Sequence, residues 1–265
     1  MEHVDVDNSV ATLARSTVLL GLCLVAVAPT VSIVTGFVFK AGLLAVLVFC
    51  ITKVWIFGLP AFWHLKIEGK SFSWSPPKNG GWVVSFALGV GMMIAVIGAY
   101  LLLGETMIDK QTLLELLEPV GLTTPSQLAG AILFWVFVNS VLEEYVFRWF
   151  ITSKIEELTG AKWTAVFLSA GVFTLHHTIA LMLFISPVGT FIASLGVFIG
   201  GAIFSWIYLQ YRSIWVAWIA VIFFLAQRFR QLDNSLLMLR WTAMIRVLAT
   251  TVPWFGLASA RMMTF

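Results

Sequence analysis

Two short clusters of ionisable residues interrupt stretches that are otherwise apolar. The first cluster lies in the segment VLEEYVFR, which ends at Arg148. On a helix, Glu144 and Arg148 are four residues apart and share a face, so they can form an ion pair. Glu143 is rotated from Glu144 by about 100°, which directs its carboxylate elsewhere. A carboxylate held away from bulk water can act as a general base near neutral pH, and we assign this chemistry to Glu143.

The second cluster is the segment FTLHH, which ends at His177. Phe173 and His177 share a helical face, so the phenyl ring can pack beside the imidazole and exclude bulk water. A neutral imidazole near the carboxylate of Glu143 can share a water molecule with it, an arrangement suited to hydrolysis. We assign supporting roles to Phe173, to His176 and to Asn139. Asn139 lies four residues before Glu143 and is expected to hydrogen-bond the substrate or a neighbouring helix.

Carboxylates and imidazoles are also ligands for zinc. If a metal is bound, Glu143 and His177 are its expected ligands. The sequence contains no H-E-x-x-H pattern and no third histidine near the pair. We therefore expect that no cofactor is required, with zinc as the alternative.

The composition shows which elements must position these residues. The chain of 265 residues is 60% hydrophobic and 11% charged, with a mean hydropathy of +0.97, whereas soluble domains are about 45–50% apolar and about 25% charged. Apolar runs of roughly 20 residues are long enough to cross a bilayer as helices. The sequence thus predicts an all-α, polytopic membrane helix bundle of about eight transmembrane helices in a single domain, residues 1–265. The predicted spans are 18–39, 41–63, 82–103, 128–150, 163–184, 189–209, 214–226 and one within 236–257, with a surface helix in 104–126.

Basic residues predict the orientation of the bundle, because cytoplasmic loops carry an excess of Lys and Arg. With the N-terminus in the cytoplasm, the inner loops before residue 221 hold seven basic residues and the outer loops hold two. The inner set is Arg15, Lys66, Lys70, Lys78, Lys154, Lys162 and Arg212, and the outer set is Lys40 and Lys110. The basic residues are scattered rather than clustered, so the lipid bilayer is an expected partner and nucleic acid is not. Lys53 is alone in the second span and is expected to snorkel or to find a partner on a neighbouring helix.

The fourth and fifth spans are joined by a short loop and should be antiparallel neighbours. At helical rise, Glu143 lies roughly 15 Å from that end of the bundle and His177 roughly 20 Å. We therefore expect the carboxylate and the imidazoles to meet at comparable depth. A proton relay in a transporter could use the same two residues, although the sequence shows no repeated halves of the kind many carriers have.

These motifs resemble those of the CPBP family, which groups CAAX-processing intramembrane endopeptidases with bacteriocin-immunity proteins, also called Abi proteins. The family motif E-E-x-x-x-R matches Glu143, Glu144 and Arg148, and the motif F-x-x-x-H matches Phe173 and His177. The resemblance implies a glutamate-dependent endopeptidase in which Glu143 activates water and His177 shares in orienting it. Glu144 and Arg148 would support the site. A view of the family as metallo-endopeptidases implies zinc.

The resemblance also implies a peptide or membrane-protein substrate and an integral membrane protein of a bacterial-type plasma membrane. It leaves the oligomeric state unknown. The similar region covers about residues 81–220, and an atypical tail begins at about residue 221.

The sequence departs from the family at Val221 and Leu225, where the family has a histidine followed four residues later by Asn or Asp. The resemblance implies that this missing pair stabilises the oxyanion, a contribution worth about 10²–10³ in rate where it has been removed. One alternative is therefore a catalytically impaired membrane protein with a binding or immunity role. Another is a shifted reading frame after about residue 220, because 8 Lys and 3 Arg precede residue 221 whereas 5 Arg and no Lys follow it.

Overall fold

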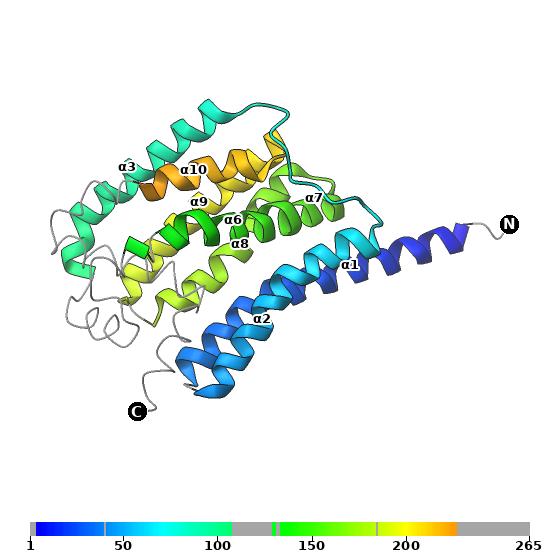
Figure 1. Cartoon of the computed structure of the whole chain (residues 1–265), viewed down its shortest axis with the longest axis horizontal. Helices are drawn as coiled ribbons and strands as arrows, with labels where there is room; N and C mark the ends of the chain where they lie inside the picture. The colour runs from blue at the N-terminus through cyan, green and yellow to red at the C-terminus, as the bar shows by residue number, and fades with distance from the viewer. Residues whose placement is uncertain (1–3, 40, 108–128, 131–132, 184, 227–265) are drawn as a thin grey trace.

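The computed structural model describes residues 4–39, 41–107, 129–130, 133–183 and 185–226 (Figure 1). All regular elements in these ranges are helical, which confirms the predicted all-α class. In chain order they are α1 (Val4–Ile33), η1 (Val34–Val38), α2 (Leu43–Phe62), η2 (Trp63–Ile67), α3 (Trp82–Met107), η4 (Trp135–Asn139), α6 (Ser140–Glu143), η5 (Glu144–Thr152), α7 (Ser153–Thr159), α8 (Lys162–Leu181), α9 (Pro187–Tyr211) and α10 (Ile214–Ala226), where η marks a π-helical stretch.

Several of these helices are long and apolar enough to cross a membrane. Within the described residues, five meet both conditions: Arg15–Gly36, Leu43–Ile67, Trp82–Ala99, Lys162–Leu181 and Pro187–Tyr211. A helical membrane bundle is therefore confirmed, and the total of eight spans stays a prediction. The span predicted in 236–257 lies outside the described residues, as does most of the predicted surface helix in 104–126.

Three groups of helices make up the bundle (Figure 1). Helices α1 and α2 pack together as one pair, and α3 packs with α10 as another. Between the two pairs lie α6, η5, α7, α8 and α9, with α8 packed extensively along α9. A buried apolar cluster joins α1, α2, η5, α8 and α9 through residues such as Val25, Ile56, Phe150, Val166 and Leu209. The middle layer therefore positions the residues singled out in the sequence.

The fourth predicted span continues well beyond its expected end. The helical run that carries Glu143 extends through η5 and α7 to Thr159. Gly160 then adopts a left-handed conformation, with φ of 65°, which glycine tolerates because it has no Cβ atom. This turn reverses the chain into α8, which packs back against η5 and α7. The predicted antiparallel neighbours are thus present.

Glycine residues permit two close helix contacts. A Cβ atom on Gly201 of α9 would lie 3.2 Å from the Phe173 ring of α8, and one on Gly89 of α3 would lie 2.7 Å from the Ala220 carbonyl oxygen of α10. Small residues are typical of such contacts between membrane helices. Gly201 is therefore at a close helix contact, whereas a Cβ on Gly196 of the same helix would have no described atom outside that helix within 4 Å.

An ion-pair cluster ties the segment after α2 to α7. Glu68 pairs with Lys154 and, at 2.9 Å, with Lys70, and Lys154 also pairs with Glu157 at 2.6 Å. Partial burial acts to raise the pKa of Glu68, but hydrogen bonds from Lys154 and Lys70 outweigh it and hold the pKa below its ordinary value. The indole of Trp63 donates a further hydrogen bond to Glu68 at 3.0 Å.

Candidate active site

The first sequence cluster forms a fully buried ion pair. Nε of Arg148 lies 3.3 Å from Oε1 of Glu144, and the two side chains are 0% and 2% exposed. The guanidinium lies over the rings of Phe173 and Phe204, at 4.7 and 5.5 Å from their centroids. Aromatic faces attract a buried cation in this geometry. The predicted pairing of Glu144 with Arg148 is therefore present, and it connects η5 to α8 and α9.

The buried pair is incompletely hydrogen-bonded. Among the described residues, Oε2 of Glu144 and both Nη atoms of Arg148 have no hydrogen-bond partner, and neither does Nδ1 of His176. Buried polar groups are nearly always paired with protein atoms or with ordered water. The cluster is therefore a place where we expect ordered water inside the bundle.

The imidazoles of the second cluster lie beside this pair. His176 and His177 of α8 are 2% and 1% exposed, and their ring centroids are 4.3 Å apart. His176 stacks on Phe147 of η5 at 5.2 Å, and the Phe147 and Phe173 rings meet edge to face at 4.8 Å. These ring contacts join the two sequence motifs in one cluster.

The hydrogen bond of His177 determines which of its nitrogens bears the proton. Nδ1 lies 2.8 Å from the carbonyl oxygen of Phe173. A carbonyl oxygen only accepts, so Nδ1 is the donor, and in the neutral imidazole Nε2 is left as an acceptor. An acceptor nitrogen of this kind can orient the O–H of a water molecule.

Glu143 directly precedes the buried pair on the same helical run, interacts electrostatically with Glu144 and Arg148, and is half-buried. Asn139, which is itself 5% exposed, donates a hydrogen bond from Nδ2 to Oε1 of Glu143 at 3.0 Å. The sequence correctly places both residues on one face, and the structure adds a partner for Asn139 on its own helical run, Glu143. A hydrogen bond from Asn139 to the substrate or to a neighbouring helix stays a prediction. The amide fixes the orientation of the carboxylate.

Lys53 is a site residue whose role the sequence did not reveal. It is the eleventh of the 20 residues of α2 and interacts electrostatically with Glu143 and with His176. Its ammonium lies 5.7 and 5.9 Å from the ring centroids of Phe49 and Phe57. The expected partner on a neighbouring helix thus exists, and it is the proposed base. The feature of the sequence that could have indicated this role is a lone lysine midway along an apolar span, because ionisable residues inside the membrane are candidate functional residues.

A hydrogen bond holds α2 against the site. The hydroxyl of Tyr145 in η5 donates to the carbonyl oxygen of Phe57 at 3.1 Å. Phe57 is one turn beyond Lys53, and Tyr145 is two residues beyond Glu143. This contact keeps the lysine and the glutamate on facing helices.

The donor set does not fit a metal site. Catalytic zinc needs three protein ligands and structural zinc needs four. Within the ranges that the structure describes, no three His, Cys, Asp or Glu side chains converge to hold an ion. Glu143 and His177, the ligands expected if zinc were bound, do not belong to such a group.

Helix α10 brings the departure from the family motif next to the site. The indole of Trp218 donates to Oγ of Ser140 at 2.8 Å, three residues before Glu143. Val221 follows Trp218 by about one turn and is half-buried. The backbone of Leu225 is also in α10. At position 221 the chain therefore presents an aliphatic side chain that cannot donate a hydrogen bond.

A buried carboxylate–guanidinium pair, two buried imidazoles and a carboxylate oriented by an amide define a polar centre inside a helical membrane bundle. Residues 125–226 match the family model described as type II CAAX prenyl endopeptidase Rce1-like. This match confirms the predicted resemblance to the CPBP and CAAX protease family, and the matched residues include η5, α8 and α9. Comparison with curated proteins and with solved structures gives no match.

Proposed function

We propose that this chain is an intramembrane endopeptidase in which Glu143 activates water for peptide-bond hydrolysis. The family match supports a CAAX-protease-like function. The observation that carries the proposal is the burial of Glu144, Arg148, His176 and His177, each at most 2% exposed, on the helical run that carries Glu143 and on the helix α8 that packs against it. Ionisable groups inside a membrane are costly and mark functional sites by default.

In the proposed reaction, Glu143 takes a proton from water while the water oxygen attacks the peptide carbonyl. Asn139 donates to Oε1 of Glu143 and so orients the carboxylate for this proton transfer. Nε2 of His177 accepts a hydrogen bond from the same water and orients it. When the carbon–nitrogen bond breaks, the proton held by Glu143 passes to the leaving amine, and the products are a carboxylic acid and an amine.

The other residues position this machinery. Glu144 and Arg148 hold η5 against Phe173 and Phe204 and so fix the helix turn that begins at Glu143. The ammonium of Lys53 compensates the negative charge of Glu143 in a surrounding of low dielectric. None of these three groups is assigned a proton transfer.

The apolar residue at position 221 is expected to limit the rate. A missing oxyanion donor costs about 10²–10³ in rate, so a chain with Val221 should turn over slowly. Because of this position, a non-catalytic binding or immunity role stays open as the alternative. A shifted reading frame is tested by the coding DNA: its other frames past codon 220 should then encode His-x-x-x-Asn or His-x-x-x-Asp.

The test is cleavage of a membrane-peptide library by the full chain in detergent, with products identified by mass spectrometry. We compare the parent, Glu143→Gln and a matched control, Glu157→Gln, whose side chain is 51% exposed at the surface. The parent and the control should cleave the same peptides, and Glu143→Gln should lose cleavage. Unchanged cleavage by Glu143→Gln would refute the mechanism. No cleavage by the parent would favour the binding role.

A further inference from the structure

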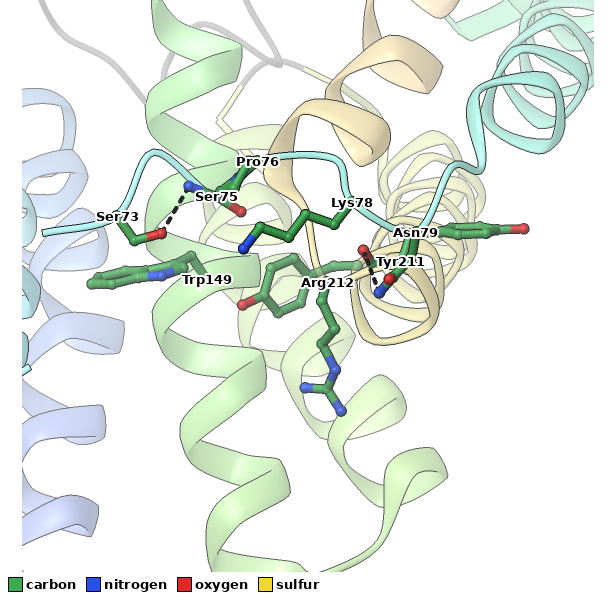
Figure 2. A pocket seen from close by; sticks show the side chains of 9 residues that line it. Ser73, Ser75, Pro76, Lys78, Asn79, Trp149, Tyr211 and Arg212 are labelled. Carbon is green, nitrogen blue, oxygen red and sulfur yellow. Dashed lines mark hydrogen bonds between the residues drawn. The ribbon is translucent and has the colours of Figure 1, made fainter. Parts of the chain in front are cut away.

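A second polar feature lies at the end of the bundle, apart from the buried cluster. A pocket of about 290 Å³, open on one side, is lined by part of the segment between η2 and α3, by the end of α9 and by Trp149 (Figure 2). The segment belongs to a connection between the candidate spans Leu43–Ile67 and Trp82–Ala99, and α9 ends at Tyr211. The pocket is therefore at the level where spans end and the chain leaves the membrane.

Hydrogen bonds fasten the segment over the turn between α9 and α10. Oγ of Ser213 donates to the carbonyl oxygen of Ser75 at 2.7 Å, and the backbone N–H of Ile214 donates to Oγ of Ser75 at 3.0 Å. The indole of Trp215 donates to the carbonyl oxygen of Trp74 at 2.6 Å. The pocket is thus held open by contacts between parts of the chain that are far apart in sequence.

A glycine allows the closest approach of this segment to α9. Gly81 has φ of 94°, and a Cβ atom there would lie 2.5 Å from the ring of Tyr211. Asn79 donates from Nδ2 to the carbonyl oxygen of Tyr211 at 3.4 Å. The segment therefore lies directly on the end of α9 and forms one wall of the pocket.

The lining is cationic. It contains Lys78 and Arg212 and no carboxylate. Arg212 makes two hydrogen bonds to Glu156, at 2.6 and 2.8 Å, which raise the pKa of Arg212 and place a negative charge beside its guanidinium. In Figure 2 the side chain of Lys78 runs across the pocket toward Trp149. Lys78 is thus the cation available to a ligand, and the hydroxyl of Ser73 lies on the same side.

The size and position of the pocket select the ligand class. Pockets for drug-sized ligands measure about 300–1,000 Å³, so this volume suits a compact group rather than a peptide segment. Trp and Tyr side chains are enriched at the headgroup level of membranes, and basic pockets between membrane helices bind anionic headgroups. We propose that this pocket binds a phosphate group, carried by an anionic phospholipid headgroup, with Lys78 as the cation that recognises it.

The test is native mass spectrometry of the full chain in detergent, and it needs no enzymatic activity. The probes are phosphatidylglycerol, phosphatidylcholine and inorganic phosphate, each titrated alone. The parent should bind phosphatidylglycerol more tightly than phosphatidylcholine. Lys78→Gln should weaken phosphatidylglycerol binding about tenfold, the worth of one hydrogen bond to a charged group, and Lys78→Glu should weaken it further. The control Lys66→Gln changes an exposed lysine near the end of the second candidate span and should bind like the parent.

Three results would overturn the proposal. Equal binding of phosphatidylglycerol by the parent and by both Lys78 variants would show that the lysine is not the recognition group. Equal weakening in Lys66→Gln would show a general charge effect. Binding of inorganic phosphate that depends on Lys78, without such binding of phosphatidylglycerol, would assign the pocket to a free anion instead of a lipid.

Discussion

Replacing Glu144 by Gln should strongly destabilise the protein, because it leaves a buried guanidinium without its counter-charge. Arg148 is 0% exposed, and its Nε lies 3.3 Å from the Glu144 carboxylate. Gln has nearly the shape of Glu, so the change removes charge without opening a cavity. Removing one partner of a buried pair costs about 3–5 kcal/mol, whereas an exposed pair is worth about 0–1 kcal/mol. The cation–π contacts of Arg148 with Phe173 and Phe204 remain in the variant, so the loss of unfolding free energy should lie toward the lower end of the range for a buried pair.

The assay is reversible unfolding of the full chain in mixed micelles, with Glu157→Gln as the surface control. Glu144→Gln should lose about 3–5 kcal/mol of unfolding free energy. The double variant Glu144→Gln/Arg148→Met should recover most of the loss, because an apolar replacement of the whole pair is often neutral or stabilising. A loss below about 1 kcal/mol in Glu144→Gln would refute the reasoning, since the pair would then behave as though it were solvated.

Three further changes test other contacts. Gly89→Ala places a Cβ atom 2.7 Å from the α10 backbone and should cost about 1–3 kcal/mol of unfolding free energy. The control Gly91→Ala meets no described atom outside its own helix within 4 Å and should not show this loss. Equal losses in the two variants would contradict the packing of α3 on α10. Glu68→Gln should destabilise the chain near neutral pH, and the difference in unfolding free energy from the parent should close as the pH falls through the lowered folded-state pKa of Glu68. Because the pKa of Glu68 is lower in the folded state, its carboxylate stabilises the fold at pH values above its unfolded-state pKa, and this stabilisation is lost as the pH falls through the folded-state pKa. A difference between Glu68→Gln and the parent that widens in acid would contradict this reasoning. Lys53→Met should lower kcat for peptide cleavage roughly tenfold with little change in KM, and Lys53→Arg should retain most of it; a fall in unfolding free energy with kcat unchanged would show a purely structural role.

Contacts within one helix could be predicted from the sequence. Glu144 and Arg148 share a face whatever the surroundings, so their spacing was enough to predict the ion pair. The same spacing places Phe173 beside His177 and Asn139 beside Glu143. A short connection between two spans also predicted that these helices are neighbours, and α8 does pack on η5.

Contacts between distant segments could not be predicted, because they depend on how the helices pack. Lys53 interacts electrostatically with Glu143 because Tyr145 and the packing of α2 bring together two segments about 90 residues apart in sequence. The π-helical stretch Glu144–Thr152 rotates the side chains after Glu143 relative to an α-helix, and no pattern in the sequence indicated it. Such stretches are frequent at functional sites.

The pocket at the end of the bundle also depends on how distant segments pack, so the sequence did not predict it. Its lining combines residues from 73–79 with Trp149 and residues from 208–212, and the hydroxyl of Ser75 ties the first segment to Ile214, just after the last. In the sequence, Lys78 was one of seven basic residues that indicated orientation. Only the fold distinguishes it from Lys66.

The decisive measurement is a double-mutant cycle on peptide cleavage with Glu143→Gln, His177→Gln and the combined variant. If carboxylate and imidazole act on one water molecule, each single change should lower kcat/KM by a large factor and the combination should be little worse, because residues that act as a unit are strongly non-additive. Single effects that multiply in the combined variant would show two independent contributions and would contradict a shared water in the site.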